Sequence, residues 1–355
     1  MSLPPRSLRG KTATSAGEER AELLLLAGGG VMTIPALSLK NAVIRYDRLT
    51  AVDGVSLDLF SGETLGLVGE SGCGKSSLAR AIVGLQPLAA GTLSVAGETL
   101  DSTATKRRND LQRRIQLLFQ DPAASLSPRM KVRALLAEPL KIRKVHSPES
   151  WAQISALAES IGLGEQLLSR YPHQLSGGQA RRVALVRALA AEPSIIVADE
   201  PTAGLDISIQ GELLNLLREL RDRLKLSYLL ISHNLNVIGR VTDRVAVMYL
   251  GQIVESGPTA DLFRYPAHPY TQALLSANLT LDPSRRRERI VLSGELPSPG
   301  NPPSGCRFHK RCPLARPRCS SEVPTLVSAG SSGRSVACHF PLMTETEALP
   351  QAITG

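Results

Sequence analysis

The sequence of 355 residues contains few aromatic side chains, since Phe, Trp and Tyr together make up 3%. A platform for single-stranded nucleic acid needs exposed rings on which bases stack, so this scarcity argues against that class of protein. Long apolar runs are also missing. The run from Leu23 to Ala27 is far shorter than the ~18 apolar residues that span a bilayer. Glu residues precede it, which is unlike a secretion signal. We therefore expect a cytoplasmic chain that meets a membrane only through partner chains.

The chain has five cysteines, and a cytoplasmic location argues against structural disulfides. Cys73 stands alone, and the other four lie near the C-terminus, at Cys306, Cys312, Cys319 and Cys338. The net charge of +9 suits phosphate ligands, nucleic acid, an anionic membrane surface or simply a solvated Arg-rich surface.

Changes in composition divide the chain into three parts. Residues 1–32 contain Pro4, Pro5 and three successive glycines, which predicts a disordered extension. Met32 is a second candidate for the start of the chain. In residues 33–262, apolar strands alternate with amphipathic helices, which predicts a mostly parallel sheet with helices on both faces. Residues 263–355 are rich in proline and predict a small, loop-rich C-terminal domain.

Periodicity locates the main elements of the middle part. Strands are predicted at 36–46, 55–59, 64–68, 115–119, 194–198, 227–231 and 244–248, and helices at 76–84, 152–161, 180–191 and 209–224.

A phosphate-binding pattern lies between a predicted strand and a predicted helix. Its residues are Gly69, Glu70, Ser71, Gly72, Cys73, Gly74, Lys75 and Ser76, followed by Ser77, and they match G-x-x-x-x-G-K-[ST] in full. The glycines let successive amides turn inward, so that these amides and the helix N-terminus bind phosphate oxygens. Lys75 adds a charge near the β- and γ-phosphates, and the Ser76 hydroxyl is a ligand for Mg²⁺. Cys73 is expected to be a small filler residue.

Two carboxylates follow the apolar strand 194–198. In P-loop nucleotide hydrolases an Asp at such a strand end helps to hold Mg²⁺, which assigns this role to Asp199. Glu200 beside it is positioned to polarise the attacking water. Without the phosphate loop the pair would indicate no more than a solvated acidic loop.

The segment Leu175–Ser176–Gly177–Gly178–Gln179 is the signature of ABC ATPases, and the order of the remaining motifs also resembles that family. Gln120 matches the Q-loop glutamine, Asp206 the D-loop aspartate and His233 the switch histidine. Tyr46 stands where the family places an aromatic that stacks on adenine, although a core aromatic would fit the same strand. The sequence departs from the family at Ala203–Gly204, where Ser–Ala is more usual.

The resemblance implies the ABC ATPase fold, with a mostly parallel core, an antiparallel β subdomain and a helical signature subdomain. It also implies that ATP and Mg²⁺ lie between two subunits packed head to tail. One subunit would supply Tyr46, the phosphate loop with Lys75 and Ser76, the Mg²⁺ ligands Ser76, Gln120 and Asp199, and the catalytic residues Glu200, His233 and Gln120. The other would supply Ser176, Gly177, Gly178 and Gln179, with Asp206 at the interface.

The C-terminal part resembles that of oligopeptide and dipeptide importers, on the segments 265–275, 294–299, 301–313 and 337–339. This implies uptake of short peptides, with nickel or another small solute as the alternative. In some members of this subfamily such cysteines hold a [4Fe–4S] cluster, so we expect a cluster, zinc or free thiols at Cys306, Cys312, Cys319 and Cys338.

The implied partners are a second ATPase chain, more often a paralogue than an identical chain, two membrane permease subunits and, through the complex, an extracytoplasmic solute-binding protein. The implied place is the cytoplasmic face of the inner membrane, with no nucleic acid bound. Arg285–Arg287 and Arg289 suit either anionic lipid headgroups or a solvated charge run.

The rival class is a non-transport ABC ATPase that acts on ribosomes or DNA. Such members usually carry two ATPase units or a long coiled coil, and this sequence has a single copy of each motif and no heptad run. A binder with an inactive site is disfavoured because Lys75, Glu200 and His233 are all present.

Overall fold

The computed structural model describes residues 34–100, 113–121, 125–277, 290–292, 294–329 and 333–342. Residues Pro35–Gly355 form one compact unit. The predicted extension 1–32 and the arginines at 285–289 lie outside the described residues. In the described part of the chain, no helix has the length and apolar character needed to cross a membrane.

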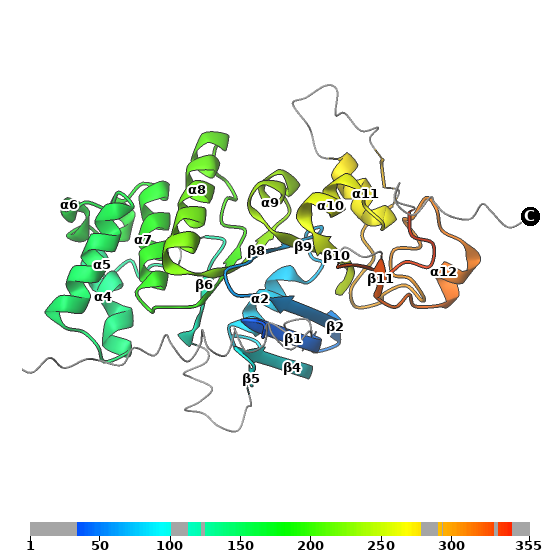
Figure 1. The fold of residues 1–355 in the computed structure, drawn as a ribbon, viewed down its shortest axis with the longest axis horizontal. Coiled ribbons are helices and arrows are strands. Elements are labelled where there is room, and N and C mark those ends of the chain that lie inside the picture. The colour runs from blue at the N-terminus through cyan, green and yellow to red at the C-terminus, as the bar shows by residue number, and fades with distance from the viewer. Residues whose placement is uncertain are drawn as a thin grey trace, which may run out of the picture. The chain divides into compact units, whose positions relative to one another are not determined.

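A mixed sheet forms the centre of the protein (Figure 1), and in the described residues its strand order is β11-β12-β10-β9-β3-β8-β7-β6. Neighbours from β9 to β6 are parallel. These strands are β3 (Thr64–Val68), β6 (Ile115–Leu118), β7 (Ile195–Asp199), β8 (Ser227–Ser232) and β9 (Arg244–Tyr249). The predicted parallel core is therefore confirmed, and the carboxyl ends of β3 and β7 lie at the same edge, on either side of β8.

A second, antiparallel sheet has the order β2-β1-β4-β5. Its strands are β1 (Leu37–Tyr46), β2 (Leu49–Leu59), β4 (Ala90–Val95) and β5 (Glu98–Thr99). Strand β2 begins six residues earlier than the predicted strand 55–59, because a tight turn joins it directly to β1. Asp47 in this turn has φ 49°, which Asp tolerates better than most residues. The sheet is the expected antiparallel β subdomain.

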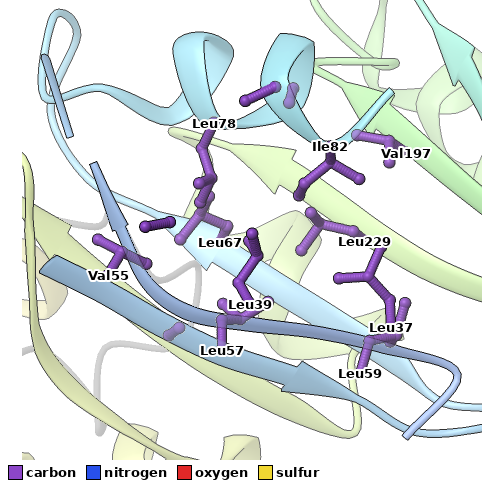
Figure 2. Packing of buried hydrophobic residues seen from close by; sticks show 14 of the residues in the cluster. Leu37, Leu39, Val55, Leu57, Leu59, Leu67, Leu78, Ile82, Val197 and Leu229 are labelled. Atoms are coloured by element: carbon purple, nitrogen blue, oxygen red, sulfur yellow. The ribbon is translucent and has the colours of Figure 1, made fainter. Parts of the chain in front are cut away.

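A first leucine-rich cluster joins the two sheets to helix α2 (Lys75–Ile82). Figure 2 shows Leu39 and Leu57 of the antiparallel sheet in one cluster with Leu67 of β3 and Leu78 of α2. Burial of a leucine side chain contributes roughly 1.5–3 kcal/mol, so this cluster fixes β3, α2 and the loop between them.

A group of helices forms the predicted signature subdomain and has a core of its own. Its members are α4 (Val132–Ile142), α5 (Pro148–Ser160), α6 (Glu165–Leu168), the 3-10 turn η1 (Pro172–Gln174) and α7 (Gly177–Leu189). Helix α5 starts four residues before the prediction. The reason is local, since Ser147 caps the helix and Pro148 takes its first position.

The remaining described helices are α8 (Ile207–Leu224), α9 (Leu235–Val241), α10 (Thr259–Arg264), α11 (Pro269–Ser276) and α12 (Pro317–Ser321). The region expected to be a loop-rich domain also contributes strands β11 (Val327–Ala329) and β12 (Arg334–Val336) to the central sheet. They join it through the antiparallel pairing of β12 with β10 (Gln252–Pro258).

A buried carboxylate holds this C-terminal extension of the sheet in place. Glu255 of β10 is fully buried and accepts hydrogen bonds from the backbone N–H groups of Ala267 (2.8 Å) and His268 (2.9 Å). The guanidinium of Arg334 in β12 donates a third, at 3.2 Å. One side chain therefore ties β10, β12 and the start of α11 together.

Candidate nucleotide site

The phosphate loop turns directly into helix α2, whose N-cap is Gly74 with φ 110°. A Cβ at this position would lie 2.3 Å from the carbonyl oxygen of Ala51. Both the left-handed backbone and the close approach require glycine here. The first turn of α2 has no side-chain cap, so its amides stay available for an anion.

Lys75 is buried, and its ammonium donates hydrogen bonds to the carbonyls of Gly69 (2.8 Å) and Glu70 (2.9 Å). Its charge therefore lies directly over the loop that would receive phosphates. Cys73 is also buried, and burial raises the pKa of its thiol, although the nearby Lys75 opposes this shift. A neutral, enclosed thiol is what a small filler residue would present.

The remaining residues of the phosphate loop and of the first turn of α2 differ in their exposure to solvent. Ser71 and Gly72 are exposed, while Ser76 and Ser77 are half-buried in the first turn of α2. The middle of the loop is therefore open to solvent, whereas the part that enters α2 is partly enclosed.

Asp199 ends β7, and its carboxylate is suited to a metal ion. Burial raises the pKa of this carboxyl, while a hydrogen bond from Ser76 acts in the opposite direction. Its Oδ1 atom is buried and has no hydrogen-bond partner within the described residues. Because Mg²⁺ prefers oxygen ligands and keeps several waters, a bare carboxylate oxygen beside a serine hydroxyl fits this ion.

Glu200 and His233 form a pair beyond Asp199, with 2.9 Å between Glu200 Oε1 and His233 Nδ1. The Glu200 N–H donates to the carbonyl of Ile231 in β8, which fixes the backbone after β7. Glu200 has φ 48°, a strained value for a non-glycine residue. Such strain fits a residue held in place for function, while the exposed imidazole leaves the carboxylate reachable.

Gln120 and Tyr46 differ in how closely they match expectation. Gln120 follows β6, the parallel neighbour of β7, and its side chain is exposed at the same edge as Asp199. Tyr46 is half-buried and packs against the first leucine cluster, and its enclosed hydroxyl has no partner in the described residues. The structure thus places Tyr46 at the border of the core and not on an open face.

The signature loop starts helix α7, which lies apart from α2 (Figure 1). Ser176 caps this helix by accepting the N–H of Gln179 at 3.2 Å, and Gln179 accepts the N–H of Ser176 at 3.0 Å. Ser176 and Gly177 are exposed, and Gly178 is half-buried. Asp206 is the exposed N-cap of α8.

Contacts that no sequence pattern predicted reach the phosphate loop from the C-terminal region. Arg311 donates two hydrogen bonds to the Glu70 carboxylate, at 2.6 and 3.0 Å. The Tyr270 hydroxyl accepts the N–H of Glu70 at 2.9 Å. These partners are 241 and 200 residues from Glu70, and no local pattern in the sequence marks them.

The four C-terminal cysteines line one pocket, together with His268, His309 and His339. Burial raises the pKa of the thiols of Cys306 and Cys312, and it raises that of Cys338 to about 11. Among the residues that the structure describes, however, no group of three or more His, Cys, Asp or Glu side chains is arranged to hold a metal ion. The expected cluster or zinc site is therefore not supported.

The parallel core, the phosphate loop, the carboxylate pair and the separate capped signature helix define a P-loop ATPase of the ABC type. Comparison with known proteins agrees. Residues 52–203 match the family described as ABC transporter, and residues 254–319 match the family described as oligopeptide/dipeptide transporter, C-terminal region. The chain belongs to the family of ABC transporter ATP-binding proteins, in the branch that carries this C-terminal region.

Several curated relatives cover most of the chain. The di/tripeptide transport ATP-binding protein DppF of Pseudomonas aeruginosa is 46% identical over 83% of this chain and 91% of its own length. The oligopeptide transport ATP-binding protein OppF of Escherichia coli is 46% identical over 82% and 87%. Among solved structures, cbiO1 of Clostridium perfringens, part of the ABC transporter complex cbiONQ, has a TM-score of 0.59 and 26% identity, covering 65% of this chain and 91% of that one.

Proposed function

We propose that this chain binds MgATP and hydrolyses it to power an ABC importer for di- and oligopeptides. The observation that carries the substrate class is the match of residues 254–319 to the C-terminal region of oligopeptide/dipeptide transporters. Relatives named for di/tripeptide and oligopeptide transport support it. Both findings favour peptides over nickel, and transport over an action on ribosomes or DNA.

Within the site, Lys75 and the loop amides bind the phosphates, and Tyr46 is the candidate for contact with the adenine. Ser76, Asp199 and Gln120 would hold Mg²⁺, which neutralises charge on the β- and γ-phosphates when bound. Glu200 accepts a proton from the attacking water, and His233 orients the Glu200 carboxylate through the 2.9 Å contact. The exposed loop at Ser176–Gln179 completes the site of a second ATPase chain, for which a paralogue is the better candidate.

In the cell the proposal places this chain at the cytoplasmic face of the inner membrane, held there by two permease subunits that receive substrate from an extracytoplasmic solute-binding protein. The test uses the complete complex in liposomes. Peptide and binding protein should stimulate hydrolysis, and nickel ions should not. Stimulation by nickel instead, or recovery of the chain with ribosomes from cells that lack the permeases, would contradict the proposal.

For the cysteine pocket we keep the [4Fe–4S] cluster as the first hypothesis, ahead of zinc and free thiols. The described residues show no formed metal site, so the hypothesis rests only on four thiols that line one pocket and come from the segment 306–312, helix α12 and the turn after β12. Iron and acid-labile sulfide would be measured on anaerobically purified protein. About four of each per chain would support the cluster. Zinc alone or no metal would refute it and leave the ATPase proposal unaffected.

A further inference from the structure

The segment Cys306–Cys312 carries two arginines, and both reach the surroundings of the phosphate loop. Arg311 holds the Glu70 carboxylate in a two-pronged contact, and its side chain is only 9% exposed. Bidentate arginine–carboxylate pairs are strong and directional, and partial burial protects them from screening by salt. Since Glu70 is the second residue of the loop, this contact fixes one end of it.

The other end of the loop is fixed by a relay. Arg307 pairs with Asp53 and with the carbonyl of Leu250. The next residue, Gly251, donates its N–H to the carbonyl of Cys73 at 2.9 Å, and its own carbonyl accepts the N–H of Asp53 at 2.9 Å. Arg307 therefore contacts Asp53 and Leu250, the two residues beside Gly251, and the Gly251 N–H supports Cys73.

Aromatic packing gives this segment a rigid base. The ring of Phe308 lies 5.2 Å from Tyr249 of β9 and 5.4 Å from Tyr270 of α11, centroid to centroid, and all three side chains are fully buried. Tyr270 in turn accepts the N–H of Glu70. The first contact is edge-to-face and the second is tilted, and such packing fixes ring orientation, so Arg307 and Arg311 project from a defined position.

Because Glu70 is negatively charged, its contact with Arg311 bears on nucleotide binding. The loop must accept a polyphosphate, and a free carboxylate among its amides would repel that anion. Arg311 neutralises this carboxylate and keeps it turned towards the C-terminal region. The same contact restricts the loop, which lowers the entropy lost when the amides close on phosphate.

We propose that the segment 306–312 is a clamp that holds the phosphate loop ready for ATP, with Arg311 as its positioning residue. This inference rests on the proposed function, because it assumes that the loop binds MgATP. It assigns to the C-terminal region a part in nucleotide affinity within the same chain.

The test measures the dissociation constant of MgATP for the full chain by calorimetry. Arg311→Ala should weaken binding about tenfold, and Arg311→Lys, which keeps the charge but loses the fork, should weaken it less. In the assembled transporter the same loss should raise KM and leave kcat nearly unchanged, because Arg311 touches no reacting atom. Arg318→Ala is the matched control, since it removes an exposed ion pair with Glu322 from the same region.

A double-mutant cycle with Glu70→Gln separates charge neutralisation from general loss of structure. In the Glu70→Gln background, Arg311→Ala should cost about threefold or less, because the repelling carboxylate is gone. If Arg311→Ala does not fold, Arg311→Lys and the double variant still decide the question.

Each outcome is distinguishable. Equal affinity of wild type, Arg311→Ala and Arg311→Lys would overturn the clamp while leaving the ATPase proposal intact. An equal loss in both Glu70 backgrounds would also overturn it. Wild-type protein that binds no MgATP would overturn the proposed function itself.

Discussion

The chain contains two glycine-rich loops that each start a helix, and they are built in opposite ways. The phosphate loop leaves the first turn of α2 without a side-chain cap, while distant residues such as Tyr270 and Arg311 hold the loop from behind. The signature loop caps its own helix through Ser176 and Gln179 and has an exposed surface. A bare helix start is ready for an anion, whereas a capped one is already partly satisfied.

This contrast between an uncapped and a capped helix start indicates where each loop finds its partners. The support of the phosphate loop comes from the same chain, so this half of the site is finished on folding. The signature loop has its exposed residues Ser176 and Gly177 free of such support, which suits the proposed contact with a second chain. The two loops are thus unlike in their support and exposure, as the proposed head-to-tail pairing requires.

The greatest loss of activity should come from a change at Glu200, which separates ATP hydrolysis from MgATP binding. Glu200→Gln should lower ATP hydrolysis by about 10³-fold, because general-base catalysis contributes roughly 10²–10⁴-fold. MgATP affinity should stay within a factor of about two, since the amide replaces the carboxylate without changing the phosphate loop. Phosphate release and calorimetry measure the two quantities. A fast Glu200→Gln enzyme would show that another group activates water.

The next effect concerns the support behind the phosphate loop. Glu255→Ala removes the acceptor of two backbone N–H groups and leaves Arg334 buried without its carboxylate. We expect a loss of about 3–5 kcal/mol in the free energy of unfolding, measured by urea denaturation. The exposed pair Lys40–Asp58 supplies the control, because Lys40→Ala should cost less than about 1 kcal/mol. Similar losses for both variants would contradict the structural role of Glu255.

A change in the signature loop should also spare MgATP binding and reduce hydrolysis, but through the partner's site in the assembled pair. Ser176→Arg should leave MgATP affinity of the isolated chain unchanged, because Ser176 lies away from its own phosphate loop. Hydrolysis by the assembled pair should fall by about 10²-fold, as when one transition-state donor is lost. Weaker binding by the isolated variant would mean that both loops act within one chain.

The smallest of these effects is a change in the free energy of unfolding with pH. Burial lowers the pKa of His268 to about 3, from an ordinary value of 6.5. The unfolded chain therefore binds more protons than the folded chain between these values, so stability is complete above pH 6.5 and falls as the pH drops towards 3. Denaturation at pH 7 and pH 5 should show this loss, and His268→Gln should flatten the slope. An unchanged slope would exclude His268 as its source.

Local patterns were enough to predict the strands and helices around the nucleotide site. The run 64–68, the glycine loop and the following helix lie within a few residues of one another, and apolar periodicity with turn-forming residues fixes such geometry. The same holds for β7, which begins and ends one residue later than the predicted strand 194–198. Sequence spacing could not decide whether Tyr46 lies in the core, because burial of its ring depends on neighbours in other strands.

The order of the phosphate loop, the carboxylate pair and the signature loop could be predicted before folding was considered, because each motif consists of contiguous residues. The extension of the central sheet by β12 and the contact between Arg311 and Glu70 exist only in the folded chain. These contacts join residues far apart in the chain, and one arginine among many carries no mark of its partner. Packing of Phe308, Tyr249 and Tyr270 selects that partner by bringing the two segments within hydrogen-bond distance.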